Sequence, residues 1–402
     1  MKSPLLLTSL SRNLRLLLFV AVSMAAFGLG VQGTVNDSPT GYIGPFNSSI
    51  SELQFLSNPG MTSSPGVTVT QFAGGMSFPR GLKFGPGGSL YVAEAGPGGD
   101  ATTVGLCTQV PAPIGPWLAG NNGRVSRLDR NGIRTTVADG FPSTFSVNGG
   151  ELGVEDISFL DGRLYALVAG GGCSHGHINP TEVNGVYRIN NNGSWNLVAD
   201  ISKFVKNHET AHPEPDDFEP DGTPYSMVAI DDSLYVVEPN HGQVLKIERN
   251  GHITRLADIS EKYGHIVPTA MTDHDGSLFV GNLGLFPITV GSSQITRVGL
   301  GGHMKTAFTG LTAVLGVAFD EYDNLYALEM STVDQNFPVP GTGRVVRINR
   351  RTGALTEVVS GLSLPTAMAF GRDGELYISN WGFGPPLGEI LKVTFNDHCR
   401  FE

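Results

Sequence analysis

The amino-acid sequence predicts an all-β protein: a six-bladed β-propeller of four-stranded blades, closed by an N-terminal strand that completes blade six. One observation is a Leu-aromatic strand that occurs six times, and another is a strand of Gly-X-Val type that follows each copy. Successive Leu-aromatic pairs lie 74, 70, 44, 47 and 51 residues apart, so blades of about 40–50 residues fit if blades one and two carry insertions. The pairs are Leu90-Tyr91, Leu164-Tyr165, Leu234-Tyr235, Leu278-Phe279, Leu325-Tyr326 and Leu376-Tyr377.

Residues 1–33 are expected to be a secretory signal peptide. Arg12 and Arg15 precede an apolar stretch from Leu16 to Val31 that contains several small residues. This stretch is shorter than the roughly 20 residues of a membrane-spanning helix, and an uncleaved anchor is the alternative. The mature protein is therefore expected to be secreted or periplasmic, with no membrane contact after cleavage.

Residues 34–66 are expected to be a flexible linker, because they are rich in Ser, Pro, Gly and Asn and lack periodicity. The propeller is expected over 67–396, and a short tail over 397–402. Blade six lacks a fourth strand after Ile390 to Phe395, while the strand Val67 to Phe72 precedes blade one without a partner. Pairing the two would remove an exposed sheet edge. Separate sheets or a sandwich are the alternative.

The composition restricts the range of partners. The 402 residues include 26 basic and 37 acidic side chains, for a formal net charge of −11, and 40 % are hydrophobic. So much apolar surface in so long a chain excludes a disordered protein. The acidic balance argues against a nucleic-acid partner, because little would neutralise the phosphates. We expect a monomer.

The repeats resemble those of NHL-type six-bladed propellers over residues 67–395. A closer resemblance is to the ScyD/ScyE family of secreted proteins, named from cyanobacterial scytonemin gene clusters. It rests on the stretches PRGLKFGPGGSLYVAEAG, DFEPDGTPYSMVAIDDSLYVVEPNHGQVLKIERNG and LPTAMAFGRDGELYISNWG. The resemblance implies a secreted or periplasmic propeller without a defined biochemical role.

The propeller topology predicts a candidate site at one end of the central channel. The first strand of each blade is expected to run along the channel and the second to return, so second-strand ends and first-strand starts share one end, which we call the mouth. The polar residues expected at this mouth as ligand-binding groups are Glu94, Glu238, Asn282, Glu329 and Asn380 after second strands, with Arg80 and Tyr225 at first strands.

Two kinds of metal site are candidates at the mouth. The ring of carboxylates and carboxamides suits a hard cation such as Ca²⁺, in a way similar in kind to the regucalcin and gluconolactonase propellers. In the alternative interpretation each Glu or Asn binds backbone groups of the blades. A second candidate set, which suits Zn²⁺, comprises Glu238, His241, His175, His177 and His212. Its alternative is an acidic, solvated loop with scattered histidines.

The three cysteines leave at least one without an intramolecular partner. Cys107 lies in the insertion of blade one and Cys173 in that of adjacent blade two, so we predict a disulfide between them, with Cys399 free. Three free thiols in a reducing compartment are the alternative.

The first function hypothesis is a non-catalytic binding protein that holds a small molecule, a glycan or a protein at the mouth. The second is a metal-dependent hydrolase or lactonase-like enzyme, in which mouth Glu and Asn side chains hold the cation and a carboxylate or His241 acts as the base. A role in making an aromatic pigment is suggested only by the name of the similar family.

Overall fold

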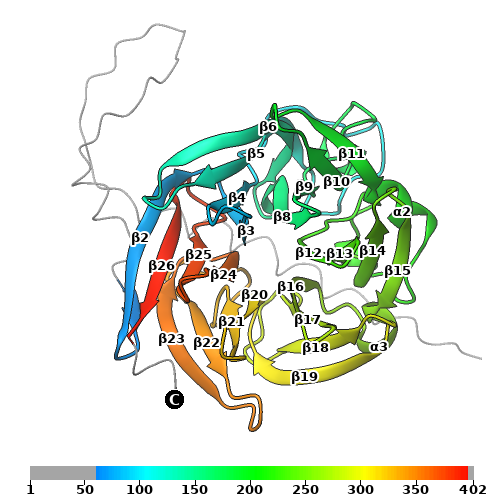
Figure 1. Ribbon diagram of the computed structural model, residues 1–402. Coiled ribbons are helices and arrows are strands. Elements are labelled where there is room, and N and C mark those ends of the chain that lie inside the picture. Colours follow the sequence, from blue (N-terminus) through cyan, green and yellow to red (C-terminus); the bar gives the residue numbers. More distant parts are fainter. Residues whose placement is uncertain (1–59, 397–402) are drawn as a thin grey trace, which may run out of the picture. The chain divides into compact units, whose positions relative to one another are not determined.

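A computed structural model, in which residues 60–396 are described, shows six antiparallel sheets arranged as the blades of a β-propeller (Figure 1). Blade one consists of β3 (Pro79–Phe84), β4 (Leu90–Glu94), β5 (Leu118–Leu128) and β6 (Arg134–Ser146), with the short β7 (Gly150–Leu152) beside β6. Blade two consists of β8 (Val154–Leu160), β9 (Arg163–Val168), β10 (Gly185–Ile189) and β11 (Trp195–Asp200). Blade three consists of β12 (Ser226–Ile230), β13 (Ser233–Glu238), β14 (Gln243–Glu248) and β15 (Ile253–Asp258).

Blade four consists of β16 (Pro268–His274), β17 (Ser277–Asn282), β18 (Ser293–Gly299) and β19 (Met304–Leu311). Blade five consists of β20 (Val314–Phe319), β21 (Leu325–Glu329), β22 (Gly343–Ile348) and β23 (Leu355–Leu362), with β1 (Thr62–Ser63) beside β23. Blade six consists of β24 (Ala367–Phe370), β25 (Leu376–Asn380), β26 (Gly388–Phe395) and, as its outer strand, β2 (Val67–Met76).

The ring is closed by the pairing of β2 with β26, as the sequence predicts. The two strands are antiparallel and pair from Val67 opposite Phe395 to Met76 opposite Gly388, with register shifts between Gln71 and Ala73 and between Gly74 and Met76, and they lie side by side in Figure 1. Upstream, Thr62–Ser63 lies within the segment expected to be a linker and pairs with Ser360 and Val359 of blade five. The chain therefore joins two adjacent blades before it enters blade one.

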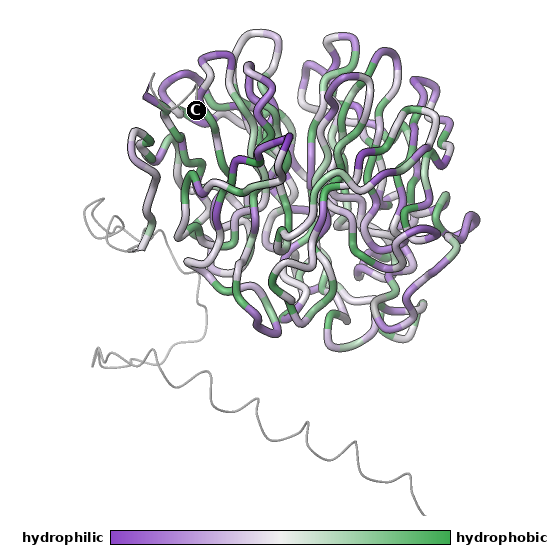
Figure 2. Tube along the Cα trace, turned by 90° about the horizontal axis from the view of Figure 1, so that it is seen from below, coloured by the Kyte–Doolittle hydropathy of each residue, from purple (hydrophilic) through white to green (hydrophobic). Residues whose placement is uncertain are grey.

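The Leu-aromatic pairs recur because each second strand is buried on both faces. In β13, Leu234 and Val236 pack in a cluster with residues of blade two, whereas Tyr235 and Val237 pack in a cluster with residues of blade four. Alternating side chains of a strand point to opposite sides, so a blade between two others needs apolar residues at consecutive positions. Figure 2 shows these apolar stretches along the strands and hydrophilic residues in many of the loops.

Two short α-helices connect blades at the mouth. Helix α2 (Ile201–Asn207) begins after Asp200, whose side chain accepts a hydrogen bond from the Lys203 amide. Helix α3 (Ile259–Tyr263) is capped in the same way by Asp258. The 3₁₀ helices are η1 (Cys173–His175) and η2 (Pro215–Asp217). Within residues 60–396, none of the helices has the length and apolar character needed to cross a membrane.

Candidate functional site

The predicted polar ring lies where the topology places it. Its five members are the last residues of β4, β13, β17, β21 and β25, and all are buried, with at most 2 % exposure: Glu94, Glu238, Asn282, Glu329 and Asn380. Each side chain binds the loop that leads into the first strand of its own blade. The loop partners are the amides of Ser77, Thr223, Thr312 and Ser363, and the carbonyl of Ile266.

Arginines and further amides occupy the remaining oxygens of this ring. Arg124 forms an ion pair of 2.8 Å with Glu94, and Arg344 pairs with Glu329. Blade two has Val168 at the ring position, and there the loop amide of Gly153 binds Glu155 instead. The ring thus anchors the blade-connecting loops, as the alternative interpretation describes, and a ligand at these oxygens would have to compete with internal bonds.

Glu238 and His241 form a buried, hydrogen-bonded carboxylate–imidazole pair at the mouth. His241 Nδ1 lies 3.0 Å from Glu238 Oε2, and the backbone amides of Thr223, Asn240 and His241 also donate to this carboxylate. Burial alone would raise the pKa of Glu238, but the imidazole and the amides outweigh it and lower the pKa to about 2. Burial would lower the pKa of His241, but the Glu238 carboxylate raises it overall. The pair therefore favours its ionised form.

Two of the other predicted metal ligands form separate pairs. His175 Nε2 lies 3.0 Å from Glu219, and His177 Nδ1 lies 2.9 Å from Glu182. The His212 side chain is exposed. Over the described range 60–396, no three His, Cys, Asp or Glu side chains are grouped so that they could hold a metal ion.

The predicted disulfide is confirmed. Cys107 and Cys173 are bonded, with their Cα atoms 6.3 Å apart, and they join the insertions of blades one and two. Cys399 lies outside the described residues.

The central channel contains a cavity of about 210 Å³. The first strands of all six blades, β3, β8, β12, β16, β20 and β24, contribute to its wall. It extends to Phe84, Phe319 and Phe370, the last residues of β3, β20 and β24. The cavity therefore lies on the axis of the ring and reaches the end of the channel opposite the mouth.

At the mouth, Tyr225 and Arg80 close this channel. The Tyr225 hydroxyl donates a 2.8 Å hydrogen bond to the Thr366 carbonyl, so it links blade three to blade six directly across the ring. Arg80 Nε donates to Glu155 at 2.8 Å, and its other nitrogens donate to the carbonyls of Gly382 and Glu151. Arg80 is fully buried, with every guanidinium nitrogen occupied. Both predicted ligand-binding residues are thus part of an internal hydrogen-bond network.

Three carboxyl groups lie near this closure. Burial raises the pKa of Glu151 to about 7, although Arg80 acts in the opposite direction. Burial also raises the pKa of Glu155 and of Asp156, against the effects of Arg80 and Lys83 respectively. In this part of the channel the neutral carboxyl form is therefore favoured more than in water.

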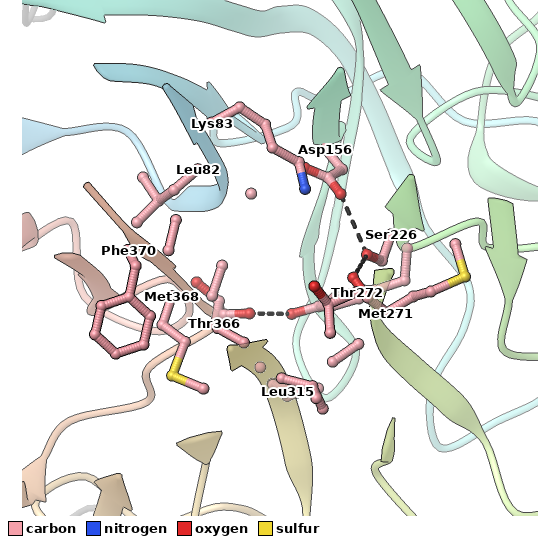
Figure 3. Close-up of a pocket in the computed structure, with 18 of the residues that line it drawn as sticks. Leu82, Lys83, Asp156, Ser226, Met271, Thr272, Leu315, Thr366, Met368 and Phe370 are labelled. Atoms are coloured by element: carbon pink, nitrogen blue, oxygen red, sulfur yellow. Dashed lines mark hydrogen bonds between the residues drawn. The ribbon is translucent and has the colours of Figure 1, made fainter. Parts of the chain in front are cut away.

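Asp156 and Lys83 are the charged groups that sequence reasoning missed (Figure 3). Asp156 Oδ2 accepts from the Met227 amide at 2.7 Å and from the Ser226 hydroxyl at 3.2 Å, and Oδ1 accepts from the Ile157 amide at 2.8 Å. Lys83 extends from β3 along the same cavity. The sequence signal that could have indicated them is the presence of a charged residue within a first strand, because the first strands consist mostly of apolar or small residues.

Comparison with solved structures finds other propellers of low sequence identity. A protein from Thermus thermophilus described as an oxidoreductase (glucose dehydrogenase) superposes with a TM-score of 0.53 at 16 % identity, covering 82 % of this chain and 100 % of that one. A protein of unknown function from Bacteroides thetaiotaomicron has a TM-score of 0.53 at 12 % identity, covering 84 % and 76 %. A gluconolactonase from Xanthomonas campestris has a TM-score of 0.50 at 12 % identity, covering 83 % and 91 %.

These similarities establish the fold alone. No protein-family model matches the sequence, and a search of curated proteins finds no match. Propellers carry many unrelated functions, so the function must be argued from the channel and the mouth of this chain.

Proposed function

We propose that the protein is a binding protein that holds a small organic molecule in its central channel. The observation that carries the proposal is the axial cavity of about 210 Å³, to which all six blades contribute. Leu315, Met368 and Phe370 give it apolar surface, while Ser226 and Thr272 supply polar groups. A concave site that combines apolar surface with convergent polar groups is a usual form of a small-molecule site.

The size of the cavity favours a small molecule over the other predicted partners, a glycan or a protein at the mouth. Drug-sized ligands occupy pockets of about 300–1,000 Å³, so this cavity suits a smaller compound. Tyr225 and Arg80 close the channel at the mouth, so the ligand would enter from the opposite end.

We further propose that the protein is a secreted or periplasmic monomer related to the ScyD/ScyE propellers. The Cys107–Cys173 disulfide supports an oxidising compartment. The charged and apolar pattern of residues 1–33 supports export, and the sequence stretches that resemble this family support the relationship.

The channel proposal can be tested with a fragment library and ligand-observed NMR. Ala367 lines the cavity, so Ala367→Met would occupy part of its volume. Ala354→Met adds the same atoms at an exposed loop position and is the matched control. We expect fragments that bind the wild type and the control but lose binding to Ala367→Met. A library without any such fragment would refute the proposal.

A metal-dependent hydrolase or lactonase-like enzyme is the second candidate. The observation that favours it is the buried Glu238–His241 pair, which combines an ionised carboxylate with an imidazole of raised pKa at the mouth. Such a pair suits a general acid–base role in which the imidazolium is the acid, and the Glu238 carboxylate is a group of the type that binds a divalent ion. The Xanthomonas campestris structural neighbour is a gluconolactonase, which supports lactones as first substrates.

Elemental analysis of the purified mature protein tests this candidate. A stoichiometric divalent ion, lost together with lactone hydrolysis in a Glu238→Gln, Glu329→Gln double variant, would support the enzyme. If reconstitution with Ca²⁺ or Zn²⁺ gives neither stoichiometric metal nor turnover, the enzyme hypothesis fails.

A further inference from the structure

We propose that the channel ligand is a small organic acid whose carboxylate is bound by Lys83. This inference rests on the proposed binding function and specifies the class of ligand.

Lys83 is a cation in the cavity whose ammonium group has no hydrogen-bond acceptor among the described residues. It lies one residue before the end of β3, is partly exposed, and contributes to the cavity wall. Its ammonium group has three donors, yet among residues 60–396 none of them makes a hydrogen bond or a direct ion pair. Arg80, three residues earlier on the same strand, uses all its nitrogens in internal bonds. Lys83 is therefore available to a ligand, whereas Arg80 is not.

The nearby Asp156 does not substitute for such a ligand. Its carboxylate already accepts hydrogen bonds from two backbone amides and from Ser226, and it is only 4 % exposed. Burial raises its pKa despite Lys83, so its negative charge is disfavoured rather than reinforced. A second carboxylate, brought by the ligand, would supply the acceptors that Lys83 lacks.

The same arrangement disfavours a cationic ligand. An amine in the cavity would meet the positive charge of Lys83, while the oxygens of Asp156 are already engaged. The remaining surface includes the apolar Leu315, Met368 and Phe370. A free inorganic anion would leave that surface uncovered, so a carboxylate attached to an apolar group fits the cavity better.

Three probes of nearly the same size separate these alternatives: benzoate, the neutral benzamide and the cationic benzylamine. Each is titrated into the full mature protein at neutral pH and low salt by calorimetry or ligand-observed NMR. A charge-assisted hydrogen bond in a partly desolvated site should favour benzoate over benzamide by roughly tenfold or more. Benzylamine should bind more weakly than either.

Variants of Lys83 test whether this residue causes the preference for benzoate over benzamide. Lys83→Met keeps an unbranched, flexible side chain that lacks the terminal ammonium group, and it should reduce the preference for benzoate to below about twofold while benzamide binding remains. Lys83→Arg keeps the charge and should keep the preference. Lys305→Met, at an exposed position of the outer strand β19, is the matched control and should behave as the wild type.

Equal binding of benzoate and benzamide to the wild type overturns the inference without any variant, but leaves the channel proposal standing. The inference is also overturned, and the channel proposal again stands, if Lys83→Met retains the full preference for benzoate over benzamide. If none of the three probes binds, the inference also fails. The Ala367→Met fragment comparison then decides separately on the channel proposal.

Discussion

Removing the disulfide between Cys107 and Cys173 should destabilise the propeller by a predictable amount. The bond joins residues 66 positions apart, and for a loop of this length the chain-entropy relation gives about 4 kcal/mol at 25 °C. The perturbation is a double variant, Cys107→Ser with Cys173→Ser. The change acts mainly on the unfolded chain, which regains the freedom that the cross-link removes.

The assay is equilibrium unfolding in urea, followed by far-ultraviolet circular dichroism for the whole propeller and by tryptophan fluorescence. We expect a lower transition midpoint and a free energy of unfolding reduced by about 4 kcal/mol, with a larger slope because the unfolded chain is less compact. Cys399→Ser is the control and should leave the midpoint unchanged. A loss below about 1 kcal/mol in the circular dichroism transition would refute the reasoning, because the insertions would then unfold independently of the blades.

Three further predictions concern the channel. Burial raises the pKa of Glu151 from 4.5 to about 7, so between these pH values the folded state binds more protons than the unfolded state, and the free energy of unfolding falls as the pH rises. Between pH 4.5 and 8 the free energy of unfolding of Glu151→Gln, measured by urea titration, should therefore rise by about 3 kcal/mol relative to that of the wild type. A difference between the two proteins that does not change with pH would contradict this prediction. A methyl group at Gly81 would overlap the Asp156 carboxylate and lie 2.9 Å from the Asp156 Cα, so Gly81→Ala should lower the free energy of unfolding by roughly 1–3 kcal/mol. Gly87 has open space around it, so Gly87→Ala is the control and should change the free energy of unfolding little. Tyr225→Phe removes the hydrogen bond across the channel and should lower the free energy of unfolding by about 1 kcal/mol, measurable as a shift of the melting temperature; an unchanged stability would argue against that bond.

The blades could be predicted because their burial leaves a pattern in the sequence. A second strand such as β13 packs Leu234 against one neighbouring blade and Tyr235 against the other, so the pair recurs wherever a blade is enclosed. The pairing of β2 with β26 followed from the missing fourth strand of blade six. The additional strands β1 and β7, of two and three residues, are too short to show any periodicity.

The candidate site was harder to predict because the same atoms serve different purposes. The carboxylate of Glu94 can bind a metal or an amide, and only the position of Ser77 and Arg124 shows that it binds the loop and an arginine. Lys83 was missed because nothing in its neighbours along the chain indicates that β3 turns this side chain toward Asp156, 73 residues later. Such juxtapositions depend on how six separate strands converge.

The closure of blade six also sets an order of events for the growing chain. Strand β2 is made about 300 residues before its partner β26, so β2 has no native strand neighbour in its blade until the blades between them have been made. A contact between such distant segments is slow to form, and an unpaired strand edge invites association with other chains in the meantime. The step that completes the ring is therefore where we expect a folding helper to matter most for this protein.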